Sequence, residues 1–122
     1  MAWEVEVTDE FKVWWNELAA AERRSIAAIV EVLEVRGPSL GRPYVERIHG
    51  SKYPNMKELR VQHAGEPYRI LFAFDPRSFA ILLVGGNKTG DKRWYQKFVP
   101  VADRIYEDHL RALKEEKRGD KI

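Results

Sequence analysis

Cysteine is absent from the 122-residue sequence, which excludes disulfides, thiol nucleophiles and thiolate metal ligands. The three histidines, His49, His63 and His109, are scattered without the spacing of a metal site, so neither a metal nor another cofactor is expected. The longest apolar run, at 79–84, is too short to cross a membrane. The first eight residues include acidic side chains and lack an apolar core, so we predict no signal peptide and a cytoplasmic protein.

Phosphate-binding glycine loops and serine-nucleophile motifs are also absent from the sequence. What it does contain is 44% hydrophobic and 33% charged residues, the composition of one folded domain over residues 1–122. Residues 1–35 carry three basic and eight acidic side chains, whereas residues 36–122 carry eighteen basic and eleven acidic ones. This division favours a polyanion as the partner of the basic part, although ordinary scatter of surface charge would also explain it. A basic partner segment would suit the acidic part, where the most prominent residues are Glu4, Glu6, Glu17 and Glu22.

Hydrophobic periodicity predicts an α+β fold with the order β-α-α-β-β-β-α. Alternating apolar and acidic residues predict a strand at 3–7. Apolar residues at helical spacing then predict a hairpin of two helices that stops at Gly37-Pro38 and covers a sheet. The stretch 38–55 has no regular period, so we predict a long loop, a kind of segment that is often functional.

The second half of the chain predicts strands at 56–62, 68–75 and 79–86. Short turns join these strands, so neighbouring strands should be antiparallel. The last two are apolar at nearly every position, which indicates that helices cover both of their faces. A final amphipathic helix is predicted after Pro100, with a charged tail at 114–122 that frays.

Cationic and aromatic side chains gather around the three predicted strands. Arg69 interrupts an apolar strand, so it must either pair with Glu58 or Glu66 or use its charge at a concave surface. Lys88 follows the last strand in a glycine-rich turn, and Tyr95 lies on the next element. Further residues that could bind nucleic acid are Lys57, Arg60, His63, Lys92, Arg93 and Lys97. The alternative for the residues around Tyr95 is a solvated basic helix face.

This set of residues is suited to cutting RNA, because the ribose 2′-OH supplies the nucleophile. The protein must provide a proton acceptor, a proton donor and positive charge for the phosphorane. Arg69 and Lys88 could supply the charge. Tyr95 could stack on a base, or exchange a proton if neighbouring cations lower its pKa. The sequence leaves the proton acceptor open.

Several short motifs occur in a fixed order: KELR at 57–60, YRILF at 68–72, LLVGGNK at 82–88, WY at 94–95 and VPVADR at 99–104. Together they resemble the RelE/ParE toxin superfamily, and above all its HigB-type, phage Gp49-like branch. The resemblance implies a RelE-like antiparallel sheet, with the N-terminal helical hairpin on one face and a C-terminal helix. It also implies a toxin of a type II toxin–antitoxin system that cuts mRNA on the ribosome without a metal. The implied antitoxin is a helix-turn-helix protein of the HigA type.

The resemblance assigns Arg69 to the scissile phosphate, Lys88 to a basic position after the last strand, and Tyr95 to the aromatic that stacks on or activates the substrate. RelE carries lysines on the first hairpin strand, where this chain has Glu58. Some HigB toxins instead use histidines near the active site, and in this chain His63 or His49 would take that role. Two alternatives remain: a ParE-like toxin that binds DNA gyrase without nuclease activity, or a degenerate toxin that only binds its antitoxin.

Overall fold

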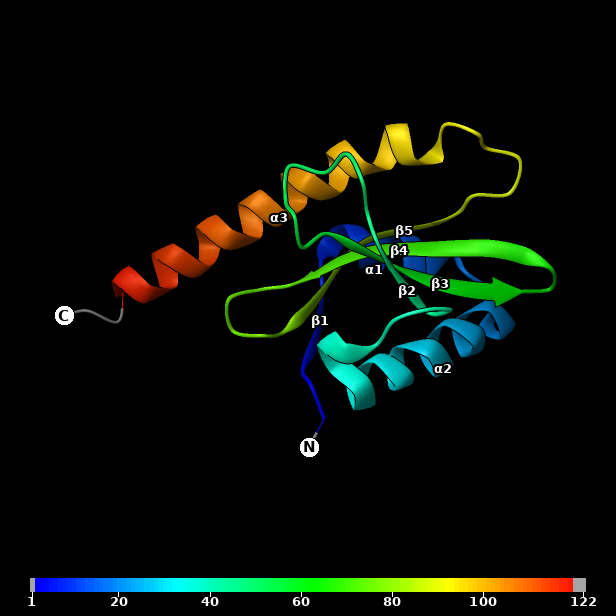
Figure 1. Cartoon of the computed structure of the whole chain (residues 1–122), viewed down its shortest axis with the longest axis horizontal. Helices are drawn as coiled ribbons and strands as arrows, with labels where there is room; N and C mark the ends of the chain where they lie inside the picture. The colour runs from blue at the N-terminus through cyan, green and yellow to red at the C-terminus, as the bar shows by residue number, and fades with distance from the viewer. Residues whose placement is uncertain (1, 120–122) are drawn as a thin grey trace.

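The computed structural model describes residues 2–119 and consists of a five-stranded mixed sheet with helices on both faces (Figure 1). The elements are β1 (Val5–Val7), α1 (Asp9–Glu17), α2 (Ala20–Arg36), the short 3-10 turn η1 (Gly37–Ser39), β2 (Val45–Arg47), β3 (Lys57–His63), β4 (Glu66–Phe74), β5 (Ala80–Asn87) and α3 (Trp94–Gly119). The strand order is β1-β5-β4-β3-β2, with β1 parallel to β5 and every other pair antiparallel. The predicted α+β class and the three-stranded meander are confirmed.

Side-chain bonds fix the ends of the two N-terminal helices. The hydroxyl of Thr8 accepts the backbone N–H of Phe11 at the start of α1, and the carboxylate of Glu22 accepts the N–H of Ala19 before α2. Helix α2 ends at Gly37, where φ is +60°. A Cβ atom there would lie 2.3 Å from the ring of Trp3, so both backbone and packing require glycine at this position.

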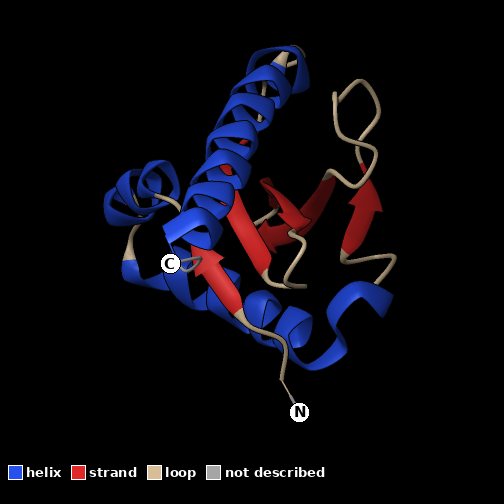
Figure 2. Cartoon of the chain, turned by 90° about the vertical axis from the view of Figure 1, so that its left-hand side faces the viewer, coloured by secondary structure: helices blue, strands red, loops and turns tan. Residues whose placement is uncertain are grey.

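Helices pack on both faces of the sheet (Figure 2), which separates two hydrophobic cores. Ile70 and Phe72 of β4 face α1 and α2, whereas Leu71 and Ala73 face α3. All four are fully buried, which confirms that the central strands are covered on both faces. Helix α1 packs on β5 and α2 on β3, so the two helices of the predicted hairpin cover different strands of the same face.

Two predicted boundaries are wrong. The stretch 38–55 is not a continuous loop, because β2 pairs within it with β3; three residues are too few to show a period. Helix α3 begins at Trp94 and not after Pro100, which lies exposed inside the helix. The helix continues to Gly119, and residues 120–122 lie outside the described residues, so the fraying of 114–122 stays a prediction.

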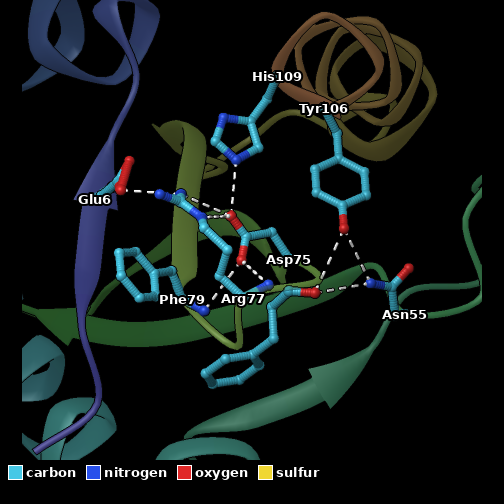
Figure 3. A network of polar contacts seen from close by, with 8 residues as sticks. Glu6, Asn55, Asp75, Arg77, Phe79, Tyr106 and His109 are labelled. Carbon is cyan, nitrogen blue, oxygen red and sulfur yellow. Dashed lines mark hydrogen bonds and ion pairs between the residues drawn. The ribbon is translucent and has the colours of Figure 1, made fainter. Parts of the chain in front are cut away.

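A buried carboxylate ties the turn after β4 to α3 and β1 (Figure 3). Asp75 accepts hydrogen bonds from the Arg77 guanidinium at 2.8 and 2.9 Å and lies 2.9 Å from Nε2 of His109. Arg77 also pairs with Glu6 on β1 at 2.9 Å. Burial by itself would raise the pKa of Asp75, but the bonds from His109, Arg77 and the backbone outweigh it and hold the pKa below its usual value. His109 therefore has a structural role, because it holds α3 to the turn that follows β4.

Candidate active site

A buried acidic residue lies at the centre of the cluster that contains the predicted catalytic residues. Glu58 on β3 and Arg69 on β4 are 4% and 9% exposed, and Nε of Arg69 lies 3.3 Å from Oε1 of Glu58. The Tyr95 hydroxyl on the first turn of α3 donates a hydrogen bond of 2.6 Å to the same oxygen. Of the alternatives left open for Arg69, the structure shows the pairing with Glu58.

Strand register brings further cations to this face of the sheet. Arg60 lies opposite Arg69 in the β3–β4 ladder, and its Nη2 atom is 2.8 Å from Glu46 and 3.4 Å from Glu58. Lys88, just after β5, has its Nζ atom 5.7 Å from the centroid of the Tyr95 ring, a cation–π contact. Of the predicted residues, Arg69 and Tyr95 thus contact one carboxylate, and Lys88 contacts the ring of Tyr95.

A glycine in β5 makes room for the start of α3. Gly86 lies opposite Arg69, and a Cβ atom there would approach Nε1 of Trp94 to 2.7 Å. Trp94 fills this space and is only 2% exposed, as expected of a core residue. Its neighbour Tyr95 is consequently held over the sheet beside Arg69 and Glu58.

The pKa of Tyr95 is raised, because the phenol is partly buried and donates to the Glu58 carboxylate. The positive charge of Arg69 opposes this rise without reversing it. Of the two roles considered for Tyr95, proton exchange required a pKa lowered by neighbouring cations, and that condition is not met. At neutral pH the residue is a neutral phenol that orients Glu58.

A cleft of about 610 Å³ opens beside the cluster. Glu58, Arg60 and Tyr95 line one side of it. The other side comes from β2 and the residues around it, which contribute Arg42, Glu46, Arg47 and His49. Neither Arg42 nor Arg47 was predicted to be a site residue. Both lie in the stretch 38–55, which was predicted to be a long loop of the kind that is often functional.

The structure does not bring two of the predicted nucleic-acid-binding residues to this cleft. Lys57 and His63 belong to the odd-numbered positions of β3, whose side chains face α1 and α2, opposite to Glu58 and Arg60. Lys57 lies 5.6 Å from the Phe74 ring centroid, and Nδ1 of His63 lies 2.7 Å from the Ser25 hydroxyl. His63 and His49 were the two histidines considered for an active-site role, and of these His49 lines the cleft.

The remaining predicted basic residues surround the start of α3. Lys92 and Arg93 are exposed, and Lys97 is paired with Asp91 at 3.0 Å. Between residues 2 and 119, no three His, Asp or Glu side chains are grouped so that they could hold a metal ion. Over the same residues, no helix has the length and apolar character needed to cross a membrane.

Comparison with known proteins gives consistent matches in sequence and fold. Residues 13–107 match the family model described as "Phage derived protein Gp49-like (DUF891)". Two proteins of Mycobacterium tuberculosis, both named as candidate toxins, are similar over most of the chain. HigB3 is 47% identical over 98 residues, which are 80% of this chain and 84% of that protein. HigB2 is 40% identical over 119 residues, 96% of this chain, but the match spans only 59% of its own length.

Two solved structures share the fold at low sequence identity. The RelE–RelB complex of the archaeon Pyrococcus horikoshii matches with a TM-score of 0.54 and 15% identity, over 74% of this chain and 99% of the matched chain. An arginine-to-alanine double mutant of the Escherichia coli toxin RelE in the free state matches with a TM-score of 0.55 and 12% identity, over 77% and 92% of the two chains. The sheet and its two helical layers are thus those of RelE.

Proposed function

The chain belongs to the Gp49-like family and is a RelE-like, HigB-type toxin of a toxin–antitoxin system, and from this premise we propose that it acts in the cytoplasm as an endoribonuclease that cuts mRNA on the ribosome. The observation that carries the proposal is the contact of Glu58 with both Arg69 and Tyr95 beside a cleft lined by basic side chains. A carboxylate next to a guanidinium combines a proton acceptor with a phosphate ligand, and this is the combination that cleavage by a 2′-OH requires.

Glu58 is the proposed proton acceptor. Its carboxylate lines the cleft, where it would take the proton of the ribose 2′-OH as the 2′-oxygen attacks the adjacent phosphorus. The P–O5′ bond then breaks, leaving a 2′,3′-cyclic phosphate on one fragment and a 5′-hydroxyl on the other. His49 also lines the cleft and is the proposed donor of a proton to the leaving 5′-oxygen, since histidine is the side chain that most often acts as a general acid or base.

Arg69 and Lys88 are the proposed ligands of the phosphorane. Nη1 of Arg69 donates to the backbone oxygen of Tyr68 at 3.0 Å, which fixes the guanidinium plane. Its Nε atom lies near Glu58 but outside hydrogen-bonding geometry. A phosphate oxygen would take the place of this contact with Glu58 and supply the counter-charge that Arg69 then lacks. Tyr95 would hold Glu58 through its hydroxyl, with its ring beside Lys88.

We propose an antitoxin as the second partner. The archaeal RelE chains of similar fold were solved together with their antitoxin RelB. For this chain we propose a helix-turn-helix antitoxin of the HigA type, a proposal that its similarity to the HigB proteins supports. The acidic residues of the N-terminal third offer a contact surface for such a partner.

The test is cleavage of a defined mRNA on programmed ribosomes, followed by primer extension and analysis of the fragment ends. Wild-type protein should release a 2′,3′-cyclic phosphate end. Glu58→Gln should slow cleavage by a factor of roughly 10²–10⁴, the usual contribution of a general base. Glu10→Gln, a change of the same kind at an exposed residue of α1, should have no effect.

Three results would change the assignment. Unimpaired cleavage by Glu58→Gln would remove Glu58 from the mechanism. Inhibition of gyrase supercoiling by the wild-type chain, without mRNA cleavage, would identify a ParE-like toxin. A chain that arrests neither translation nor gyrase and still binds its antitoxin would be a degenerate toxin.

A further inference from the structure

Tyr44 is an exposed aromatic residue that the proposed mechanism does not use. It comes just before β2, between Arg42 and Val45, and both of these residues line the cleft of about 610 Å³. With an exposed fraction of 37%, it is among the large hydrophobic residues that remain open to solvent. The chain therefore brings an exposed ring to the border of the proposed active site.

The register of β2 and β3 places Tyr44 on the same face of the sheet as the catalytic cluster. The backbone N–H of Arg60 donates to the carbonyl of Tyr44 at 2.7 Å, one step beyond the pair formed by Val45 and Leu59. Residues directly opposite each other in an antiparallel pair have their side chains on the same face. Tyr44 is therefore the neighbour of Arg60, whose side chain contacts Glu58.

Tyr44, Arg60 and Arg69 form one row across the sheet. Arg60 lies opposite Arg69 in the β3–β4 ladder, as Tyr44 lies opposite Arg60. Neighbouring strands are about 4.8 Å apart, so two strand spacings put Tyr44 roughly 10 Å from Arg69. An RNA strand with its scissile phosphate at Arg69 can therefore reach Tyr44 with the base of a flanking nucleotide.

Backbone hydrogen bonds and buried neighbours hold the turn that carries Tyr44. Its N–H and the N–H of Val45 both donate to the carbonyl of Gly41 at 3.0 Å, which closes a tight turn. Leu40 before the turn and Val45 after it are each 5% exposed and belong to the core under the N-terminal helices. A tyrosine has only two side-chain torsions, so a ring on such an anchored turn loses little freedom when a base stacks on it.

The charges around Tyr44 suit a nucleotide. Arg42 on the same turn and Arg60 across the sheet both pair with Glu46. The Arg42 side chain is 84% exposed, and a surface ion pair of this kind contributes little, so Arg42 can exchange Glu46 for a phosphate at small cost. An aromatic ring beside arginines is the arrangement with which proteins bind unpaired nucleotides, because the ring stacks on the base and the cations contact the backbone.

We propose that Tyr44 is a stacking site for the unpaired base of a nucleotide that flanks the scissile phosphate. The base lies flat on the phenol ring, and Arg42 binds the phosphate of the same nucleotide. Every base has a π-face, so the site accepts all four bases and favours purines, whose larger rings overlap more with the phenol. The site requires a single strand, because a base inside a duplex does not expose its face. That the ligand is RNA rests on the proposed nuclease function.

The test measures cleavage on programmed ribosomes after a base next to the cut has been removed. The cut is first mapped on the intact mRNA, and an abasic nucleotide is then placed on one side of it in a second mRNA and on the other side in a third. For the wild-type chain, at least one abasic position should slow cleavage roughly 5- to 150-fold, as loss of a base–aromatic stack implies. Tyr44→Leu, which keeps an apolar side chain without a ring, should slow cleavage of the intact mRNA by a similar factor.

Combining the protein variant with the abasic mRNAs identifies the base that Tyr44 contacts. At the matching position, Tyr44→Leu should cut the abasic mRNA as fast as the wild-type chain does, because no base remains to stack on the ring. At the other position the two losses should multiply, as for independent contacts. Tyr44→Phe keeps the ring and should cut the intact mRNA at the wild-type rate. Val13→Ala, which shortens an exposed apolar side chain of α1, should do the same.

The proposal is overturned if neither abasic position slows the wild-type chain, or if the losses multiply at both positions. It is also overturned if Tyr44→Leu cuts the intact mRNA at the wild-type rate, or if Tyr44→Phe is as slow as Tyr44→Leu, which would assign the effect to the hydroxyl. In each of these cases the wild-type chain still cuts the intact mRNA, so the nuclease proposal stands. A wild-type chain that cuts no mRNA would instead overturn the nuclease proposal, and the RNA site with it.

Discussion

Replacing Arg69 by methionine should destabilise the fold as well as impair cleavage, because the arginine is one half of a buried ion pair. The substitution keeps much of the side-chain volume but leaves the Glu58 carboxylate, 4% exposed, without its partner on β4. Breaking a buried pair from one side costs about 3–5 kcal/mol. Arg60 at 3.4 Å and the Tyr95 hydroxyl at 2.6 Å still contact Glu58, so we expect a value near the lower end, about 3 kcal/mol.

The reciprocal change, Glu58→Gln, leaves Arg69 buried without a counter-charge and should also cost about 3 kcal/mol. The double variant Glu58→Gln/Arg69→Met removes both charges, so neither remains unpaired. We therefore expect it to cost about 2–3 kcal/mol less than the sum of the single variants, a coupling energy within the range for contacting residues.

Urea unfolding at equilibrium, followed by tryptophan fluorescence, measures these energies, and Trp94 reports from beside the cluster. With an m-value of about 1.5 kcal/mol/M, a cost of 3 kcal/mol moves the midpoint by about 2 M. Arg24→Ala, which removes an exposed arginine of α2, should move it by less than about 0.3 M, since surface changes rarely exceed 0.5 kcal/mol. Additive costs, with a coupling energy below about 0.5 kcal/mol, would refute the view that Glu58 and Arg69 stabilise each other.

Two further predictions concern Tyr95 and Asp75. Tyr95→Phe keeps the ring beside Lys88 but removes the 2.6 Å bond to the Glu58 carboxylate, so cleavage of mRNA on ribosomes should slow by roughly tenfold or more, as loss of a hydrogen bond to a charged group worth about 1.5–3 kcal/mol implies; an unchanged rate would show that the hydroxyl does not position Glu58. Asp75→Asn should lower the free energy of unfolding at pH 7 by roughly 2–3 kcal/mol, because Arg77 and His109 lose a charged acceptor. Because the pKa of Asp75 is lower in the folded state than in the unfolded state, the wild-type chain loses stability as pH falls below about 4, and Asp75→Asn should lose less over that interval in acid titrations of unfolding.

The helices and the long strands could be predicted because their apolar residues repeat over several turns or alternations. Strand β2 could not, because three residues, Val45 to Arg47, give too few alternations and owe their conformation to pairing with β3. The start of α3 was missed for a different reason. Proline usually lies at the beginning of a helix, but Pro100 is on the exposed side of α3, where the missing N–H bond is offset by the burial of Trp94 and Val99 on the opposite side.

Part of the active-site prediction could have been sharpened from strand alternation alone. Lys57 and His63 share the odd-numbered positions of β3 with Leu59 and Val61, which are buried against the N-terminal helices. Only the even-numbered positions, which include Glu58, can meet Arg69 on the opposite face. Arg42 and His49 needed the structure, since nothing periodic connects their segment to the cleft.

Glu58 changes how the proposed catalytic cluster would work. If a lysine stood at this position, every group near Arg69 would be cationic and would attract phosphate before any conformational change. Here the carboxylate neutralises Arg69 in the free protein, and Arg60 is shared with Glu46, so the net positive charge lies further out, at Lys88, Arg47, and Lys92 and Arg93 just before α3. RNA should therefore be captured by the outer charges, which makes binding sensitive to salt. The phosphate would then reach Arg69 only by separating it from Glu58, and that step frees the carboxylate to accept the 2′-OH proton. In this arrangement the ion pair that stabilises the resting protein also keeps its base occupied until a phosphate is in place.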